Sequence, residues 1–269
     1  MINGAVLGSP ITHSLSPALH KAAFDLLGID GNYKAINVPE FTLKNFLDER
    51  SRDFDYFSIT MPLKEEVLEL GFETDPYTIK IQSANCLYRR NNAWKLTSTD
   101  GSGFLAALDA AGKNSFERVL VLGAGGTARA VVGALDSCTK NLIVLGRSDL
   151  RREALESSAT GCNFEYRRWT LDIDFSEFDL VVNTTPAGAA DLLADAVQQG
   201  ECSTLFDVIY KPWPTVLASR WADSGGTVIN GLELLMYQGI DQLELVLNRT
   251  LDRLALATHL RAVLKKAAK

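Results

Sequence analysis

Two residues that could exchange a proton with a substrate lie in the first hundred residues. Lys64 belongs to the segment SITMPLKE, and Asp100 ends the segment TSTD. A partly desolvated lysine beside a carboxylate can give a proton to, or take one from, a hydroxyl or carbonyl oxygen. The simpler interpretations are that Lys64 is a solvated residue of a helix that Pro62 opens, and that Asp100 caps the next helix.

Hydroxyl and amide side chains surround this pair in the sequence. Ser14 and Ser16, in GSPITHSLSP, lie beside a predicted helix start, where hydroxyls and free N–H groups could hold a small carboxylate. Ser16 before Pro17 is also a good N-cap, which explains one of the two hydroxyls. We interpret His13 as a structural hydrogen-bonding residue. Asn85, in SANC, begins a predicted hairpin, where a turn residue is the simpler interpretation.

A glycine-rich segment lies in the middle of the chain. In RVLVLGAGGTARAVVGAL, an apolar strand pattern runs directly into glycines and then into a helix, and Gly123 to Ala128 fit G-x-G-x-x-A. Gly123 would allow the tight turn, and Gly125 would let the backbone approach a pyrophosphate. The helix N-terminus would offer free N–H groups to that anion. Flanked by a strand and a helix, the motif predicts a dinucleotide site.

The end of the next predicted strand bears on the choice between NAD and NADP. Enzymes that select NAD often carry Asp or Glu there, whereas this chain has Arg147 and Ser148. A guanidinium and a hydroxyl suit a 2′-phosphate. Two alternatives remain: Arg147 as a surface residue at a strand end, and Asp149 as its partner or as a contact to the ribose. We favour NADP over NAD.

The elements that must position these residues alternate between strands and helices. Apolar runs predict strands at INGAVLG, NYKAINV and FDYFSIT, and a hairpin joins ANCLYRR to AWKLTS through Asn91-Asn92. From about residue 114, six strands spaced by helices predict a doubly wound parallel sheet. The predicted helices are 16–28 with Ser16 as N-cap, 41–50, 62–71, 101–111, 231–247 and 251–265.

This alternation predicts an α/β protein with two domains. An N-terminal α/β substrate domain would span residues 1–100 and would be completed by C-terminal helices, residues 238–269, that return to it. A Rossmann-like NADP-binding domain would span residues 101–237. The cleft between the two domains would hold the substrate.

Composition limits the classes of partner. The chain has 269 residues, 46% of them hydrophobic, and a formal net charge of -6, whereas a nucleic-acid binder is more often basic with clustered cations. No apolar run approaches the ~20 residues that span a bilayer, and the N-terminus lacks the pattern of a signal peptide. We therefore expect a small-molecule substrate, no nucleic acid, no membrane, and either a monomer or a homodimer.

The cysteines are far apart in the sequence. No two form a C-x-x-C pair, and no His lies near enough to suggest a zinc site. This spacing predicts separate reduced thiols in a cytoplasmic protein and no metal site. The four cysteines are Cys86, Cys138, Cys162 and Cys202.

Taken together, these motifs resemble the shikimate dehydrogenase family over nearly the whole chain. The resemblance is carried by GSPITHSLSP, SITMPLK, SANCLY, STDGSGF, LGAGGTAR, NTTPAG, DVIYKPWPT and GLELLMYQG. It implies reversible, NADPH-dependent reduction of 3-dehydroshikimate to shikimate, a step of chorismate and aromatic amino acid biosynthesis.

The resemblance also implies roles for the matching residues. Lys64 and Asp100 would form the catalytic pair at the reacting oxygen. The residues that would hold the substrate are Ser14, Ser16, Thr60, Asn85, Tyr210 and Gln238. The residues that would hold the cofactor are Gly123, Ala124, Gly125, Gly126 and Thr127 at the pyrophosphate, Arg147 and Ser148 at the 2′-phosphate, and Val208 and Gly231 by the nicotinamide.

Three positions depart from the usual family pattern. Ser58 and Ser98 stand where the family commonly has asparagine. Gly146, before Arg147 and Ser148, stands where the common motif N-R-T or N-R-S begins with asparagine. One alternative is therefore a quinate or quinate/shikimate dehydrogenase that uses NAD, although the small serine pair favours shikimate. A second alternative is a non-catalytic nucleotide-sensing protein on the same fold. The presence of both Lys64 and Asp100 favours an enzyme.

Overall fold

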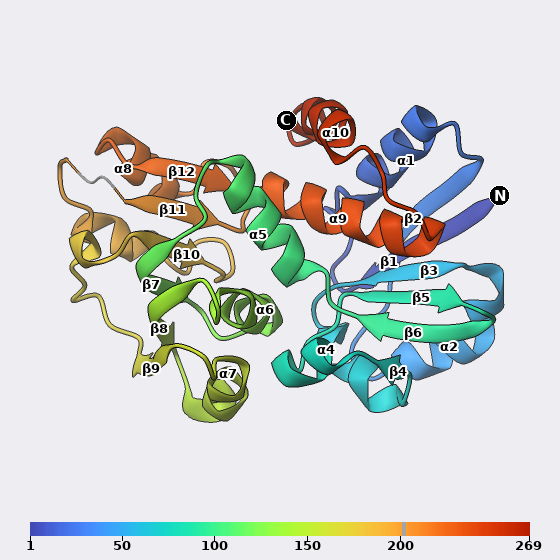
Figure 1. Ribbon diagram of the computed structural model, residues 1–269, viewed down its shortest axis with the longest axis horizontal. Coiled ribbons are helices and arrows are strands. Elements are labelled where there is room, and N and C mark those ends of the chain that lie inside the picture. Colours follow the sequence, from blue (N-terminus) through green and yellow to red (C-terminus); the bar gives the residue numbers. More distant parts are fainter. Residues whose placement is uncertain (201–202) are drawn as a thin grey trace. The chain divides into compact units, whose positions relative to one another are not determined.

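The computed structural model describes residues 1–200 and 203–269, which form two compact units. The first unit comprises Met1–Gly103 and Leu235–Lys269, and the second comprises Phe104–Leu234. Cys202 lies outside the described residues. The C-terminal helices α9 (Gly231–Leu247) and α10 (Arg253–Ala267) return to the first unit, as predicted, and α10 packs against α1 (Ser16–Leu27; Figure 1).

The first unit is built on a mixed six-stranded sheet in the order β2-β1-β3-β5-β6-β4. β1 runs parallel to β2 and β3, whereas β5 is antiparallel to β3 and β6. Its strands are β1 (Ile2–Gly8), β2 (Gly31–Asn37), β3 (Tyr56–Ile59), β4 (Glu73–Thr74), β5 (Cys86–Arg90) and β6 (Ala93–Thr97). Its other helices are α2 (Leu43–Arg50), α3 (Leu63–Glu66) and α4 (Pro76–Ile81), and α5 (Asp100–Ala110) begins in it.

Local sequence explains where several of these elements turn. Asn91 and Asn92 join β5 to β6 with φ of 52° and 64°, which is the left-handed backbone of a tight hairpin. The predicted N-cap was wrong: Leu15 occupies the cap position and Ser16 is the first helical residue. The hydroxyl of Ser14 accepts from the N–H of Ser16 at 3.3 Å instead. The predicted helix at 41–50 begins two residues late, because Phe41 has a φ of 66°.

Parallel pairing brings two loops of the first unit to one edge of its sheet. β1 and β3 are parallel neighbours, so the chain leaves both strands at the same edge. There the N–H of Ser9 donates to the carbonyl of Met61 at 3.1 Å. The loop that contains Ser14 and the loop that leads to Lys64 therefore start side by side. Below them, Leu7, Phe57, Leu63 and other apolar residues form a buried core.

The second unit confirms the predicted doubly wound parallel sheet. Its order is β12-β11-β10-β7-β8-β9, and every neighbouring pair is parallel, which is the strand order of a dinucleotide-binding fold. Its strands are β7 (Phe116–Leu122), β8 (Thr139–Gly146), β9 (Asn163–Arg168), β10 (Leu180–Asn183), β11 (Thr204–Asp207) and β12 (Thr227–Asn230). Its helices are α6 (Gly126–Leu135), α7 (Arg152–Ser158) and α8 (Val216–Asp223).

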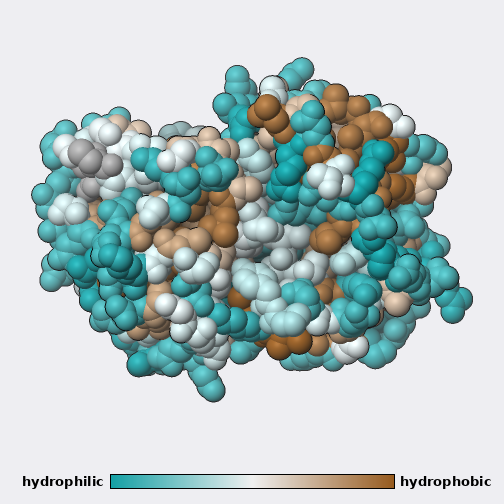
Figure 2. Space-filling model, in the orientation of Figure 1, coloured by the Kyte–Doolittle hydropathy of each residue, from teal (hydrophilic) through white to brown (hydrophobic). Residues whose placement is uncertain are grey.

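Short 3-10 segments complete the described chain. They are η1 (Ser51–Asp53), η2 (Val67–Leu70), η3 (Asp149–Arg151), η4 (Phe175–Glu177) and η5 (Asp191–Ala196). Within residues 1–200 and 203–269, no helix combines the length and the apolar character needed to cross a bilayer. Figure 2 shows apolar surface over α1 and α10, helices on which Leu26 and Leu254 are exposed.

Candidate active site

A lysine–aspartate pair forms the centre of a polar cluster in the first unit. Lys64 lies in the first turn of α3, just after β3, and Asp100 is the first residue of α5. The Lys64 ammonium donates to Oδ2 of Asp100, and the two side chains are only 15% and 7% exposed. A pair this sheltered needs further hydrogen bonds to offset desolvation.

Asn85 supplies one of those hydrogen bonds. Its amide nitrogen donates to Oδ1 of Asp100 at 2.7 Å, so each carboxylate oxygen of Asp100 has a donor. Its own carbonyl oxygen accepts from the backbone N–H of Thr99 at 2.7 Å. Asn85 is 3% exposed and Thr99 is equally buried. The carboxylate is therefore fixed from two sides by side chains on different elements.

Two glutamines of α9 extend the cluster. Oε1 of Gln238 accepts from Asn85 at 3.1 Å and from Nε2 of Gln242 at 2.9 Å. Gln242 is fully buried, and it also donates to the backbone carbonyl of Asn85 at 3.1 Å. Its Oε1 accepts from the hydroxyl of Ser58, which in turn accepts from the hydroxyl of Tyr33.

Sequence reasoning missed Gln242 and Thr99. The signal for Gln242 was its position four residues after Gln238, since residues four apart share one face of a helix. Thr99 had no comparable signal, because its contribution comes from its backbone N–H as well as its hydroxyl. Lys64, Asp100, Asn85 and Gln238 are the predicted residues that the structure joins directly.

Other predicted substrate residues lie nearby in the fold or in the other unit. Ser16 is 6% exposed, Ser14 and Thr60 are half-buried, and all three follow β1 or β3 at the edge described above. Tyr210 belongs to the second unit, where it follows β11.

The glycine segment of the second unit has the geometry of an anion cradle. Gly123 has a φ of 107°, which glycine adopts readily, and its N–H donates to the carbonyl of Leu145 at 2.9 Å. Gly125 occupies the N-cap of α6 without a side-chain cap, and a Cβ built on it would meet nothing within 4 Å. Space and the N–H groups of a helix N-terminus therefore coincide here, as a pyrophosphate requires.

The other predicted cofactor residues lie at carboxyl ends of neighbouring strands. Arg147 and Ser148 are exposed just after β8. Val208 follows β11 and Gly231 follows β12, and a Cβ built on Gly231 would overlap the carbonyl of Val208. In sheets of this kind ligands bind outside these strand ends. The residues of the second unit thus fit a dinucleotide.

Comparison with known proteins shows the family of the chain. A family model described as the shikimate dehydrogenase substrate binding domain matches residues 6–87. The shikimate dehydrogenase (NADP(+)) of Staphylococcus aureus strain MSSA476 is 28% identical over 267 residues, which cover 92% of this chain and 93% of that protein. The crystal structure of Mycobacterium tuberculosis shikimate dehydrogenase has a TM-score of 0.86 and 32% identity, with 97% of this chain and 100% of that chain covered. The chain belongs to the shikimate dehydrogenase family.

A second solved structure of the family is of similar likeness. Shikimate 5-dehydrogenase from Thermus thermophilus, in complex with NADP(H) and shikimate, has a TM-score of 0.84 and 32% identity, with 98% of this chain and 100% of that chain covered. The predicted family membership is confirmed.

The three departures from the usual shikimate dehydrogenase pattern have different surroundings. Ser58 is part of the buried polar cluster through Gln242. Ser98 donates its backbone N–H to Thr78 at 2.8 Å and lines a cavity of about 590 Å³ in the first unit. Gly146 lies against the Tyr166 ring.

Hydrogen bonds join residues of two further shikimate dehydrogenase motifs to each other. Asn183, in NTTPAG, donates to Oδ1 of Asp207 at 3.2 Å, and Thr215 donates to Oδ2 at 2.7 Å. Burial raises the pKa of Asp207, although these hydrogen bonds act in the opposite direction. The motifs thus tie together the segments that follow β10 and β11.

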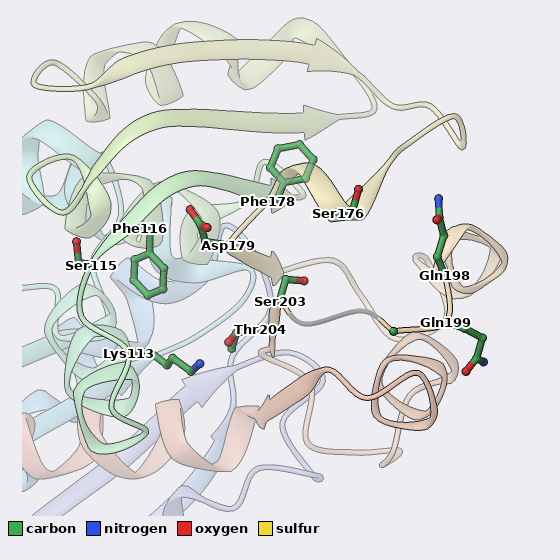
Figure 3. A pocket seen from close by; sticks show the side chains of 11 residues that line it. Lys113, Ser115, Phe116, Ser176, Phe178, Asp179, Gln198, Gln199, Ser203 and Thr204 are labelled. Atoms are coloured by element: carbon green, nitrogen blue, oxygen red, sulfur yellow. The ribbon is translucent and has the colours of Figure 1, made fainter.

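A cavity of about 470 Å³ lies in the second unit, away from the strand ends just described (Figure 3). Phe116 and Thr204 in its lining begin β7 and β11, so it lies at the amino ends of the strands. The carboxylate of Asp179 accepts from the backbone N–H groups of Glu117 and Arg118 at 2.7 and 2.8 Å. Its position separates this cavity from the nucleotide end of the sheet.

Proposed function

We propose that this chain is an NADP-dependent shikimate dehydrogenase, which reversibly reduces 3-dehydroshikimate to shikimate in aromatic amino acid biosynthesis. The sheltered Lys64–Asp100 pair carries the proposal. Hydride transfer at an alcohol carbon needs a group that handles the hydroxyl proton, and this pair provides one. The names of the Staphylococcus and Thermus relatives, which specify NADP and shikimate, support the choice of cofactor and substrate.

The first unit supplies the acid–base chemistry. Lys64 gives a proton to the reacting oxygen in reduction and takes it back in oxidation. Asp100 orients the Lys64 ammonium, and Asn85 holds Asp100. Of the two, the Lys64 ammonium carries protons that it can give, whereas the Asp100 carboxylate only accepts, so we assign proton transfer to Lys64. Its 15% exposure leaves part of the side chain accessible.

The remaining roles follow the sequence matches. Ser14 and Ser16 would hold the carboxylate of the substrate, which their position at a helix start supports. The ring substituents would be bound by Thr60, Asn85, Gln238 and Tyr210. The substrate domain would comprise residues 1–100 and 238–269, and the cofactor domain residues 101–237.

The nicotinamide of NADP, when bound, supplies or accepts the hydride. The backbone from Gly123 to Thr127 would hold the pyrophosphate, and Arg147 with Ser148 would bind the 2′-phosphate. Val208 and Gly231 would lie beside the nicotinamide. The exposed position of Arg147 and the open helix end at Gly125 support this assignment.

The test is a matrix of two substrates against two cofactors. Initial rates with shikimate and quinate, each with NADP and NAD, should give the highest kcat/KM for shikimate with NADP. A higher value for quinate would make the chain a quinate dehydrogenase, and equal values with both cofactors would remove the role of Arg147. Nucleotide binding without any formation of reduced nicotinamide would indicate a sensing protein.

Location and assembly complete the proposal. We place the enzyme in the cytoplasm, which three cysteines without disulfides, Cys86, Cys138 and Cys162, support. Burial raises the pKa of the Cys86 thiol, so this cysteine would be unreactive. A monomer or a homodimer is expected, and light scattering of the purified protein at working concentration distinguishes the two.

A further inference from the structure

Side chains of β9 hold the backbone of the turn that Arg147 and Ser148 form. β9 runs parallel to β8, with Tyr166 opposite Val144 and Arg168 opposite Gly146. The Tyr166 hydroxyl donates to the carbonyl of Ser148 at 2.5 Å. Nη1 of Arg168 donates to the carbonyl of Arg147 at 3.0 Å. Two side chains from one face of β9 therefore fix two successive carbonyls of the turn.

Gly146 is what allows Tyr166 to reach the turn. A Cβ built on Gly146 would overlap the Tyr166 hydroxyl and would lie 2.7 Å from Cζ of the ring, closer than Cβ atoms approach other atoms. Any larger residue at position 146, including the asparagine common in the family, would displace the tyrosine. In this chain the side chain of Tyr166 fills the space beside the end of β8.

The charges around the turn favour an anion. The carboxylate of Asp149 lies 3.7 Å from the Arg168 guanidinium, so Asp149 pairs across to β9. Arg152 pairs with Glu156 at 2.7 Å and lies 5.9 Å from the centre of the Tyr166 ring. Within the described part of the chain, the exposed guanidinium of Arg147 forms no ion pair.

We propose that Tyr166 and Arg168 are positioning residues for the 2′-phosphate of NADP. By holding the carbonyls of the turn they fix the backbone that carries Arg147 and Ser148, and Arg168 also keeps Asp149 from opposing the phosphate. The inference rests on the proposed function, because it assumes that this turn receives NADP. It adds that selection of NADP over NAD depends on β9 as well as on the turn.

Binding of nucleotide fragments to the full-length protein tests the role directly. Adenosine 2′,5′-bisphosphate carries the 2′-phosphate and adenosine 5′-monophosphate lacks it, and calorimetry gives the affinity of each. Tyr166→Phe should weaken binding of the bisphosphate by roughly 3–10-fold, the range expected for one hydrogen bond. Arg168→Met should weaken it by at least as much, since Asp149 is also released. Binding of the monophosphate should stay unchanged.

Arg167→Met is the matched control. Arg167 lies on the other face of β9 and pairs with Glu165 at 2.6 Å, so its loss should leave both affinities unchanged. Gly146→Ala should weaken binding of the bisphosphate as Tyr166→Ala does. The double variant Gly146→Ala/Tyr166→Ala should bind it no more weakly than either single variant, because both changes break the same contact between Tyr166 and the turn. The kcat/KM ratio for NADP over NAD should fall in parallel with the bisphosphate affinity.

The outcomes separate the two proposals. If the wild-type protein binds the bisphosphate no more tightly than the monophosphate, NADP selectivity fails and this inference fails with it. If the wild-type protein prefers the bisphosphate and Tyr166→Phe and Arg168→Met retain that preference in full, the proposed function stands and the role of β9 is refuted.

Discussion

At the scale of single residues, burial separates Lys64 from the surface lysines. Lys44 also pairs with an aspartate, Asp48, at 2.6 Å, but those side chains are 70% and 62% exposed, against 15% and 7% for Lys64 and Asp100. An exposed pair of this kind contributes little to stability. The sheltered pair keeps an ammonium group in a fixed position, which is what proton transfer requires.

Replacing Lys64 by alanine should therefore affect turnover more than binding. Loss of general acid–base help should lower kcat by ~10²–10⁴-fold, with a much smaller rise in KM for shikimate. Steady-state rates over a range of shikimate concentrations at saturating NADP measure both constants. Lys44→Ala is the control and should keep wild-type values. Full turnover by Lys64→Ala would exclude the proposed role.

Much of this cluster could be predicted from residue types and their order. Lys64, Asp100 and Asn85 each stand at the edge of an element, where parallel and hairpin strands bring chain ends together. What could not be predicted is which atom bonds which, for example that Asn85 holds Oδ1 of Asp100. The wrong N-cap at Ser16 has a related cause, since Ser14 competes for the same N–H groups.

At the scale of elements, α9 connects the cluster to the interior of the first unit. Gln238 and Gln242 lie one turn apart on it, and Gln242 bridges Asn85 to Ser58. Because Gln242 is fully buried, its carboxamide needs buried partners, and it finds them in Ser58, the Asn85 carbonyl and Gln238. The orientation of Asn85, and through it of Asp100, thus depends on a residue of α9.

Gln242→Leu should weaken this support. The change removes the acceptor of the Ser58 hydroxyl and one of the two donors to the Asn85 carbonyl, the other being the N–H of Ile59, which should cost about 1–3 kcal/mol of unfolding free energy. We also expect kcat to fall roughly 10-fold as the Lys64–Asp100 pair loses its orientation, a loss near 1.4 kcal/mol in transition-state stabilisation. Urea unfolding and steady-state kinetics measure the two effects.

Gln242→Glu distinguishes positioning from simple destabilisation. A glutamate keeps an acceptor for Ser58, but a buried, protonated carboxyl has one proton to donate where the amide has two, so it cannot donate to both Asn85 and Gln238. The comparison is the double variant Gln242→Leu/Ser58→Ala. If positioning is the role, the kcat of Gln242→Glu should fall even if its free energy of unfolding is close to that of this double variant. A destabilised Gln242→Leu enzyme with wild-type kcat would show that the residue is purely structural.

The regular elements were predictable and the irregular ones were not. Five of the six strands of the second unit follow from apolar runs between helical patterns, which is the signal of a parallel sheet, whereas the edge strand β9 is mostly polar. β4 consists of Glu73–Thr74 alone, and two residues carry no alternation that could predict a strand. The left-handed Phe41 is held by a contact between residues far apart in sequence, because the Glu66 carboxylate accepts from its N–H at 2.9 Å.

At the scale of the whole molecule, one buried histidine links folding to pH. His20 is fully buried in α1, where Nδ1 shares a hydrogen bond of 2.8 Å with the Tyr56 hydroxyl and the ring stacks on Tyr33 at 4.0 Å. Its Nε2 has no hydrogen-bond partner among the described residues. A charged imidazole would bury an unsatisfied N–H here, and burial accordingly lowers the pKa of His20 to about 3.

The lowered pKa sets the sign of the pH effect. An unfolded histidine titrates near 6.5, so between about pH 6.5 and 3 the unfolded chain binds a proton that the folded chain refuses. The contribution of neutral His20 to stability is therefore complete above about pH 6.5 and is lost as the pH falls toward 3. From about pH 7 to about pH 5 this loss should amount to about 2 kcal/mol of unfolding free energy.

His20→Phe should remove that dependence, because phenylalanine keeps an aromatic ring beside Tyr33 and does not titrate. Urea unfolding followed by circular dichroism at the two pH values gives the change in unfolding free energy for each protein. The wild-type value should fall by about 2 kcal/mol more than the value for His20→Phe. The unfolding free energy of His259→Gln, a change at an exposed position of α10, should fall by as much as that of the wild-type protein. Equal pH dependence in all three proteins would show that His20 carries a proton in the folded state.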